Sequence, residues 1–468
     1  MIDKREILEF ASTLKLAPNV VEKDYVLGWI LAGISNNSEL DSWAFKGGTC
    51  LKKCFFETYR FSEDLDFTLS AAGHIDEDFL KKVLSDTCTW ITEESGITLP
   101  REQISVDIYT NPRGKLSCQG KLGYRGPLSL PTNAGWPKIK LDLTSDERVV
   151  LPPSRRPVFH PYSDSPEGGI SVNCYAYTEA FAEKFRALGE RTRPRDLYDV
   201  VNLFRHLDGR PSPFVLRDVL KQKCEYKSIP VPTMEALAPF KEDLEAKWQA
   251  MLAHQLPVLP QVADFWAALP EIFDWITTGA AAPQREIIRA GASEISTIRS
   301  RVLPMSIPSR ARQALEIIRF AATNQLCVDL SYDGKVRRIE PYSLRETADH
   351  NYVLHAIRSD SGDHRSYRLD RIQSASVSSQ SFSPRYVIEL TESGPVPVVQ
   401  STAQPRSERT APKGSTRSKN NGPTYVYRCP SCGKTFERKS MNASLNPHKN
   451  SQGFQCYGSN GTFVRTKY

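Results

Sequence analysis

Residues 46–67 read KGGTCLKKCFFETYRFSEDLDF, a Gly-Gly-Thr turn followed by an Asp-Leu-Asp triplet. Alternate side chains of an extended strand share a face, so Asp64 and Asp66 should point together while Leu65 and Phe67 point into a core. Two carboxylates placed in this way repel each other unless a cation lies between them. The triplet therefore predicts a strand whose polar face binds a metal ion.

A third acid lies in the stretch KIKLDLT, which alternates in the same way. Its apolar side chains Ile139, Leu141 and Leu143 should face the core, and Asp142 should face the other way. Hard divalent cations such as Mg²⁺ prefer oxygen ligands and leave positions for substrate phosphates. Three carboxylates on two neighbouring strands predict a site for one or two Mg²⁺ or Mn²⁺ ions that serves phosphoryl transfer.

The turn supplies what the acids lack, because Gly47 and Gly48 let backbone N–H groups approach a triphosphate closely. A helix beginning at about Cys50 would direct its positive end to the same place. Gly-Gly and Asp-x-Asp each occur by chance in many chains. Their order and spacing here predict a nucleotide site.

These residues resemble a known family. A glycine-rich turn, a short helix, Asp-x-Asp on one strand and a third acid on another resemble the DNA polymerase β-like nucleotidyltransferase superfamily. The wording KGGT…RFSEDLDF resembles the AbiEii/AbiGii nucleotidyltransferase toxins of bacterial abortive-infection and toxin–antitoxin systems. VEKDYVLGWIL, residues 21–31, and EAFAEKFRALGERTRPRDLYDV, residues 179–200, resemble two further segments of that family.

The resemblance implies an α/β (α+β) nucleotidyltransferase domain with a helical C-terminal part over residues 1–240. It implies transfer of a nucleoside monophosphate from an NTP to an acceptor, in some family members the 3′ end of tRNA, with release of pyrophosphate. Asp64 and Asp66 would hold the metal ions, and Asp142 would help to activate the attacking hydroxyl. The implied nucleotide-binding residues are Gly47, Gly48, Thr49, Lys184, Arg195 and Asp196.

The basic residues of the downstream segment also have a structural interpretation. Lys184 and Arg195 could bind phosphates, or they could belong to an exposed helix end at which Asp196 makes structural ion pairs. The family resemblance favours a functional role for Lys184 and Asp196. Arg191 and Arg193 stay undecided between the two interpretations.

Residues 301–395 form a compact unit, a helix-like stretch followed by short strands, which resembles a WYL domain. The resemblance implies that ligand or nucleic-acid contacts come from Tyr332, Arg338, Tyr352, Arg368 and Arg371. The naming triplet is degraded, since Asn351-Tyr352-Val353 keeps only the tyrosine. Arginine and tyrosine on neighbouring strands can bind phosphates and stack on bases. The alternative is an ordinary small sheet with half-buried tyrosines and solvated arginines.

Residues 424–468 contain Cys429, Cys432, His448 and Cys456 in a C-x2-C-x15-H-x7-C pattern. A Cys-x-x-Cys knuckle followed by glycine suits Zn²⁺ bound at ~2.3 Å from each sulfur. A domain this small needs a metal to fold, so a structural zinc ribbon is predicted. A redox Cys-x-x-Cys usually starts a helix beside a βαβ pattern, which this segment lacks.

Charge and composition divide the chain further. Residues 401–468 hold 12 Lys and Arg against two Glu, while the whole chain has a net charge of +7, so the basicity belongs to the tail and predicts a polyanionic partner there. Residues 241–300 are predicted to be a helical connector, and residues 396–423 a basic disordered linker. The other seven cysteines are predicted to be reduced core thiols. No signal peptide or membrane span is recognisable, which predicts a cytoplasmic protein.

Three functions stay open. The first is a metal-dependent nucleotidyltransferase toxin with RNA as its acceptor and a cognate antitoxin as its partner. The second is a non-catalytic WYL and zinc-ribbon regulator that binds nucleic acid. The third is nucleotidyl transfer onto a protein. The complete set of three acids favours the first function, since a retired site has no reason to keep carboxylates that repel one another.

Overall fold

The computed structural model describes residues 1–56, 59–128, 135–206, 209–279, 285–288, 291, 293–298, 309–390, 424–438, 443–446, 448–449, 455–456 and 460–467. The chain divides into two units, Met1–Pro397 and Val398–Tyr468. The predicted linker, residues 396–423, lies outside the described residues.

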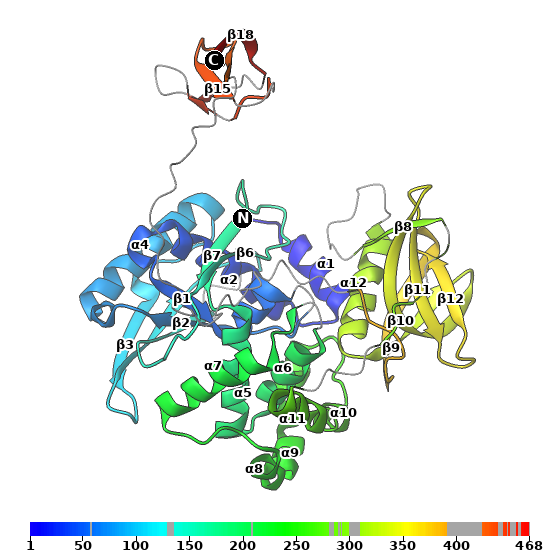
Figure 1. The fold of residues 1–468 in the computed structure, drawn as a ribbon. Helices are drawn as coiled ribbons and strands as arrows, with labels where there is room; N and C mark the ends of the chain where they lie inside the picture. Colours follow the sequence, from blue (N-terminus) through cyan, green and yellow to red (C-terminus); the bar gives the residue numbers. More distant parts are fainter. Residues whose placement is uncertain are drawn as a thin grey trace, which may run out of the picture. The chain divides into compact units, whose positions relative to one another are not determined.

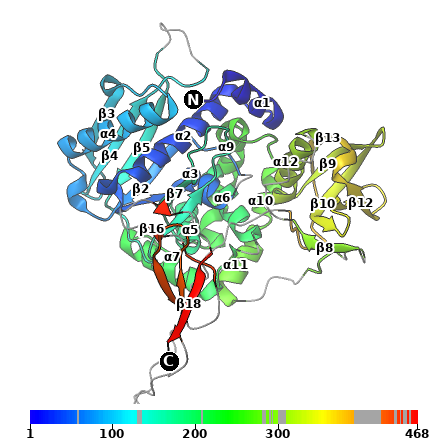
Figure 2. The ribbon, with the colours of Figure 1, turned by 90° about the horizontal axis from the view of Figure 1, so that it is seen from above.

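The first unit is built on a seven-stranded mixed sheet with the strand order β3-β4-β5-β2-β1-β7-β6 (Figures 1 and 2). The strands are β1 (Trp43–Lys46), β2 (Asp64–Leu69), β3 (Ile104–Thr110), β4 (Leu116–Gly123), β5 (Lys138–Thr144), β6 (Ser154–Val158) and β7 (Ile170–Cys174). Strand β2 is antiparallel to β1 and parallel to β5. The predicted alternation is confirmed, because Leu65, Phe67, Ile139, Leu141 and Leu143 are all buried.

Helix α2 (Pro18–Asn36) is buried over most of its length, and it packs against β7 and against α4 (Glu77–Ser95). Pro18 occupies its first turn, where a missing N–H costs nothing. Two acids of the VEKD sequence are buried in this helix for structural reasons. Glu22 accepts a hydrogen bond from the Leu128 N–H at 2.7 Å, and Asp24 forms a 2.7 Å ion pair with Lys53. The Asp24 pair ties the chain that follows the glycine turn to α2.

After strand β7 the first unit continues as a group of helices, which is drawn in green in Figure 1. Its members are α5 (Tyr177–Arg191), α6 (Pro194–Arg205), α7 (Pro213–Lys227), α8 (Met234–Leu237), α9 (Lys241–Leu252), α10 (Val262–Trp266) and α11 (Leu269–Thr278). The predicted connector, residues 241–300, is thus helical only as far as Thr278. Its later part includes a strand, β8 (Glu294–Thr297), because the far end of the long strand β10 offers a free edge there.

The WYL-like module consists of α12 (Ser309–Thr323) and a six-stranded sheet. Besides β8, its strands are β9 (Leu326–Tyr332), β10 (Lys335–Thr347), β11 (Tyr352–Arg358), β12 (His364–Arg368) and β13 (Ile372–Ser381). Helix α12 followed by strands β9 to β12 matches the order of a helix and then short strands that the sequence analysis expects in residues 301–395. The module shares one continuous hydrophobic core with the part of the same unit that holds the seven-stranded sheet.

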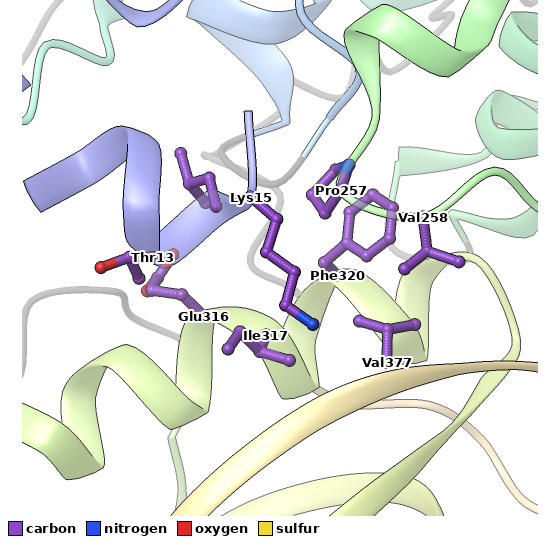
Figure 3. Close-up of a pocket in the computed structure, with 9 residues that line it drawn as sticks. Thr13, Lys15, Pro257, Val258, Glu316, Ile317, Phe320 and Val377 are labelled. Carbon is purple, nitrogen blue, oxygen red and sulfur yellow. The ribbon is translucent and has the colours of Figure 1, made fainter. Parts of the chain in front are cut away.

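Figure 3 shows one point of this junction, where side chains of α1 (Lys4–Leu14), α12 and β13 approach Pro257 and Val258. Only a cavity of about 20 Å³ is left there, between Lys15, Phe320 and Val377. That is room for about one water molecule. The junction is therefore close-packed at this point.

The second unit contains a three-stranded sheet, β15-β14-β18, and a two-stranded ladder. The strands are β14 (Thr424–Arg428), β15 (Thr435–Arg438), β16 (His448–Lys449), β17 (Gln455–Cys456) and β18 (Thr462–Lys467). Among the residues that the structure describes in this unit, the buried core consists of Tyr427, Cys429 and Leu445.

Candidate active site and metal centres

The three predicted acids are brought together by the register of two parallel strands. Asp66 of β2 lies directly beside Asp142 of β5, and Asp64 lies beside Lys140. All three carboxylates are partly buried. Among the residues that the structure describes, no ion pair involves Asp64 or Asp66, and Asp142 accepts one long hydrogen bond, at 3.3 Å, from Gln119.

This arrangement makes the acids costly to ionise. Burial raises the pKa of Asp66 to about 6, even though Lys46 and Lys184 act against the increase, and the charges of Asp142 and Asp64 add to it. Burial also raises the pKa of Asp64, opposed by Lys140 and reinforced by Asp142. A divalent cation between the carboxylates would remove this cost. The donor set therefore fits Mg²⁺ or Mn²⁺.

The glycine turn joins β1 to the short helix α3 (Gly47–Cys50), so the helix begins three residues earlier than expected. Gly47 has φ +82°, and a Cβ at this position would lie 2.0 Å from Asp66 Oδ2. A Cβ on Gly48 would lie 2.6 Å from the Arg60 guanidinium. The Thr49 hydroxyl donates to the Asp64 carbonyl at 2.5 Å. The turn is thus packed directly onto the strand of acids, and neither glycine can be replaced without strain.

Two lysines flank the acids. Lys46, opposite Asp66 in the β1–β2 ladder, forms a 3.3 Å ion pair with Glu147. Burial alone would lower the pKa of Lys46, but the carboxylates of Glu147, Glu183 and Asp66 together raise it. Lys184 of α5 is buried and reaches Asp199 at 2.8 Å. The positive charge of Lys184 also lowers the pKa of Asp66.

Asp199 of α6 organises this side of the site, and the sequence analysis missed it. Its carboxylate accepts two hydrogen bonds from Arg60 and one from the Tyr59 hydroxyl, each at 2.7 Å, besides its contact with Lys184. Burial would raise the pKa of Asp199, but Arg60 and Lys184 hold it well below its usual range. The sequence did contain a signal for Asp199. In RDLYDV it follows Asp196 by three residues, so the two acids are neighbours on one face of the helix.

The other residues of the downstream segment divide between the two interpretations. Both carboxylate oxygens of the buried Asp196 accept hydrogen bonds from Arg191, at 2.7 and 2.8 Å. This ion pair corresponds to the structural interpretation of Asp196. Arg195 donates to the Met251 carbonyl at 3.3 Å, and its charge interacts with Asp64. Burial lowers the pKa of Arg195, and the nearby Arg60 lowers it further. Arg195 thus lies close to the acids, while Asp196 is occupied elsewhere.

The four predicted zinc ligands converge in the second unit. The sulfur atoms of Cys429 and Cys456 are 3.7 Å apart, and the Cys432 sulfur is 3.2 Å from His448 Nε2. Sulfur atoms bound to one tetrahedral Zn²⁺ at ~2.3 Å are separated by roughly 3.8 Å. His448 Nδ1 lies 2.9 Å from the Asn446 carbonyl, a contact that leaves Nε2 free to bind metal. The set fits a closed zinc site.

A second sulfur cluster was not expected. The sulfur atoms of Cys50, Cys54 and Cys174 all lie within 4.8 Å of one another, in the core behind the glycine turn. These thiols are buried and free, as are the other predicted core cysteines. Three converging sulfur atoms could hold a thiophilic metal ion.

Among the predicted WYL-like residues, the structure brings Tyr332 and Arg368 into direct contact. The Tyr332 hydroxyl accepts a hydrogen bond from the Arg368 N–H at 3.3 Å, so these two residues are neighbours. The guanidinium groups of Arg338 and Arg368 are both paired with adjacent carboxylates, those of Asp329 and Asp370. The remaining two residues, Tyr352 and Arg371, are partly buried and exposed, respectively. The arginines therefore match the ordinary-sheet alternative more closely than a ready anion pocket.

Comparisons with known proteins match two parts of the chain to known families. The family model "Nucleotidyl transferase AbiEii toxin, Type IV TA system" matches residues 29–275, and the WYL domain model matches residues 313–377. A comparison with curated proteins gives no match. Among solved structures, MenT4, a nucleotidyltransferase toxin from Mycobacterium tuberculosis, is 17% identical over 60% of this chain and 91% of that chain, with a TM-score of 0.38. Proteasome accessory factor B/C of Arthrobacter aurescens is 16% identical over 44% of this chain and 32% of that chain, with a TM-score of 0.15.

The family model of the transferase spans more than half of the chain and includes the glycine turn, the three acids and Lys184. The WYL model covers α12 and the strands as far as β13. The identification rests on these two family models. The chain belongs to the AbiEii family of nucleotidyl transferase toxins and carries a WYL domain after the transferase domain.

Proposed function

We propose that this chain is a toxin that uses a divalent metal ion, Mg²⁺ or Mn²⁺, to transfer a nucleoside monophosphate from an NTP to RNA, with the 3′ end of tRNA as the acceptor. The observation that carries the proposal is the group formed by Asp64, Asp66 and Asp142. Two of these carboxylates have raised pKa values, and no described cation pairs with Asp64 or Asp66. A bound divalent cation would offset the cost of ionising such a group.

In this proposal each part of the site has one task. When bound, the divalent ion supplies charge neutralisation for the carboxylates and for the phosphates of the NTP. Backbone N–H groups of Gly47, Gly48 and Thr49 bind the triphosphate, which the missing side chains of the two glycines allow to approach closely. Lys184, held by Asp199, contributes a positive charge toward the phosphates. Arg195 adds a second positive charge near Asp64.

Asp142 acts on the acceptor. One of its oxygens faces Gln119, and the carboxylate accepts the proton of the attacking hydroxyl. A bond then forms between that oxygen and the α-phosphorus, while the bond from the α-phosphorus to the leaving pyrophosphate breaks in line. Asp196 has no step in this mechanism, because both its oxygens are bound to Arg191. We assign it the task of fixing the start of α6.

The remaining modules supply partners. The zinc-ribbon module, with Cys429, Cys432, His448 and Cys456 around a structural Zn²⁺, would contact nucleic-acid phosphates through the basic residues of the C-terminal region. A toxin that modifies RNA requires a cognate antitoxin in its own cell, so we include such a protein among its partners. We place its action in the cytoplasm, where NTPs and tRNA are found. None of the helices that the structure describes is long and apolar enough to cross a membrane.

The test is an incubation of the full chain with Mg²⁺, each labelled NTP in turn and total RNA, beside the Asp66→Asn variant. The proposal expects label in small RNA with one of the four nucleotides, and no label with the variant. Label in a partner protein instead of RNA would show that the acceptor is a protein and that the chain is still a nucleotidyltransferase. Absence of label under every condition, together with tight binding of nucleic acid, would establish the non-catalytic regulator in its place.

A further inference from the structure

A cavity lies inside the first unit at the junction between the transferase helices and the WYL domain. Its volume is about 100 Å³, and none of the predicted nucleotide-binding or WYL-like residues lines it. The transferase part contributes the end of α6 and residues of the α10–α11 region, and the WYL part contributes Gln325 and the segment after β13. The lining residues are Phe204, Arg205, Arg210, Ala268, Glu271, Arg285, Gln325, Pro384, Tyr386, Val387 and Ile388.

Positive charge dominates this lining. Arg205, Arg210 and Arg285 share the lining with one carboxylate, that of Glu271, and the nearby carboxylate of Asp264 also acts on Arg205. The cavity is therefore short of negative charge.

The three guanidinium groups are held in fixed positions by their surroundings. The Nε of Arg210 donates to the Phe204 carbonyl at 2.7 Å, and the guanidinium carbon of Arg210 lies 3.8 Å from the centre of the Phe204 ring. The Nε of Arg285 donates to the Pro384 carbonyl at 2.8 Å. Arg205 lies over the ring of Phe265, with its guanidinium carbon 4.8 Å from the centre. These contacts orient the planar groups without neutralising them.

One guanidinium nitrogen of a lining residue lacks a hydrogen-bond partner among the described residues. The Nη1 atom of Arg205 is buried and has no hydrogen-bond partner among the residues that the structure describes. A buried N–H of a charged group without an acceptor destabilises the folded protein. An anion bound beside Arg205 could supply an acceptor.

Other buried arginines of this chain show the effect of a carboxylate in direct contact. Asp199 keeps the pKa of Arg60 above its usual value despite burial, and Glu183 does the same for Arg186. At the junction the balance is reversed. Burial lowers the pKa of Arg205 and that of Arg210 to about 10, because neighbouring carboxylates do not compensate it and Arg285 adds repulsion.

We propose that this junction cavity binds a phosphate group through Arg205, Arg210 and Arg285. Planar guanidinium groups match the oxygen geometry of phosphate, and a cavity of this volume has room for a tetrahedral oxyanion. The phosphate group can come from inorganic phosphate, from pyrophosphate or from the end of a nucleotide that extends outward.

Helix α6 connects the cavity to the residues of the candidate active site. Arg205 is the last residue of α6, the helix that carries Asp199, and Asp199 holds Lys184. The neighbouring Tyr198 of α6 donates to Asn324 of the WYL domain at 2.8 Å. Phosphate at the junction would therefore bear on the helix that arranges the active site. Binding itself does not depend on the proposed reaction.

Calorimetric titration of the full chain tests the proposal, with inorganic phosphate, pyrophosphate and ATP in turn and no added divalent metal. We expect saturable binding of at least one of the three, and comparison among them identifies the source of the phosphate group. Arg205→Gln should weaken that binding tenfold or more. Glu271→Gln should strengthen it severalfold, because it removes the competing carboxylate, and an improved variant cannot be explained by misfolding.

Arg217→Gln is the matched control. Arg217 also donates to a carbonyl, that of Thr277, and packs on a phenylalanine ring, but it does not line the cavity. Its replacement should leave the dissociation constant within about twofold of the wild-type value. The proposal is overturned if none of the three anions binds, if Arg205→Gln binds as tightly as the wild type, or if Lys184→Gln rather than Arg205→Gln abolishes binding.

Discussion

Asp66 and Asp199 are two partly or fully buried carboxylates that share a neighbour, Lys184, and their environments are opposite. Asp199 receives Arg60, Tyr59 and Lys184 at 2.7–2.8 Å, and its pKa is held well below the usual range. Asp66 has no ion-pair partner among the described residues, and burial raises its pKa to about 6.

The difference separates a positioning residue from a metal-binding residue. A protein can satisfy a buried acid with its own cations, as it does at Asp199. At Asp66 it leaves the acid without an ion pair among the described residues, beside two further acids, an arrangement that a bound cation would stabilise. Variants that exchange charge for neutrality at the two positions should therefore have opposite effects on stability.

The largest expected effect is on catalysis at Asp66. Asp66→Asn should lower the rate of nucleotidyl transfer by roughly 10³-fold or more, because loss of metal-dependent charge stabilisation costs several kcal/mol in the transition state. The measurement is the initial rate of label transfer from an NTP under saturating Mg²⁺. A variant that keeps more than a tenth of the wild-type rate would contradict the role given to Asp66.

Next in size is the loss of stability at Asp199. Asp199→Asn leaves Arg60 and Lys184 without their buried counter-charge, and breaking such a pair costs about 3–5 kcal/mol. The free energy of unfolding, from denaturant titration at pH 7, should fall by that amount. The stabilisation that Asp199 provides is present above the pKa of an unfolded aspartate and is lost as the pH falls through its depressed folded value. A neutral effect of the substitution would show that the network does not hold the site.

Asp66→Asn should change stability in the opposite direction. A carboxyl whose pKa is about 6 in the folded state and about 3.9 in the unfolded chain binds its proton more tightly when folded, so its ionisation at pH 7 destabilises the metal-free protein by up to about 3 kcal/mol. The metal-free variant should therefore be more stable than the wild type at pH 7. That advantage should shrink as the pH falls from 7 to 4. Thermal unfolding at several pH values without added Mg²⁺ measures it, and a less stable variant at pH 7 would refute the electrostatic comparison.

Gly47→Ala tests how closely the turn must approach the acids. The backbone has φ +82°, and the new Cβ would meet Asp66 Oδ2 at 2.0 Å, so we expect a loss of about 1–3 kcal/mol in stability together with weaker NTP binding. Gly114→Ala is a useful control, since it has φ +75° but open space around it. Equal losses in the two variants would mean that backbone strain alone, and not contact with Asp66, explains the effect.

The smallest expected effect concerns the link between α6 and the WYL domain. Tyr198→Phe removes the hydrogen bond to Asn324 and keeps the ring that stacks on Phe265. The free energy of unfolding should fall by about 0.5–1.5 kcal/mol, as for an ordinary hydrogen bond. A loss above 3 kcal/mol would show that this contact supports more of the junction than one bond can.

The sequence was sufficient for features that depend on local order. Period-two alternation predicted which face of β2 and β5 carries Asp64, Asp66 and Asp142, and the register confirms it. Cysteine spacing predicted the zinc ligands in the same way. Both predictions needed only the pattern of neighbouring residues and the geometry of a strand or a knuckle.

Features that depend on long-range packing could not be predicted. The contact between Asp199 and Arg60 joins segments that are far apart in the sequence, so nothing local distinguished Asp199 from other acids on a helix. The sequence analysis instead named Asp196 as a nucleotide-binding residue, and in the structure Asp196 is bound to Arg191. The three core cysteines converge only because β7 lies beside β1. The arginine-lined junction cavity depends on how the WYL domain packs against α6, which no local pattern records.

The most direct test of the account is Mn²⁺ binding measured by electron paramagnetic resonance with the wild-type chain, Asp66→Asn and Asp199→Asn. Mn²⁺ takes the same oxygen ligands as Mg²⁺ and is visible by this method. We predict that the wild type binds one or two ions, that Asp66→Asn loses them, and that the folded fraction of Asp199→Asn still binds. Equal Mn²⁺ binding by the wild type and Asp66→Asn would contradict the claim that these acids form a metal site.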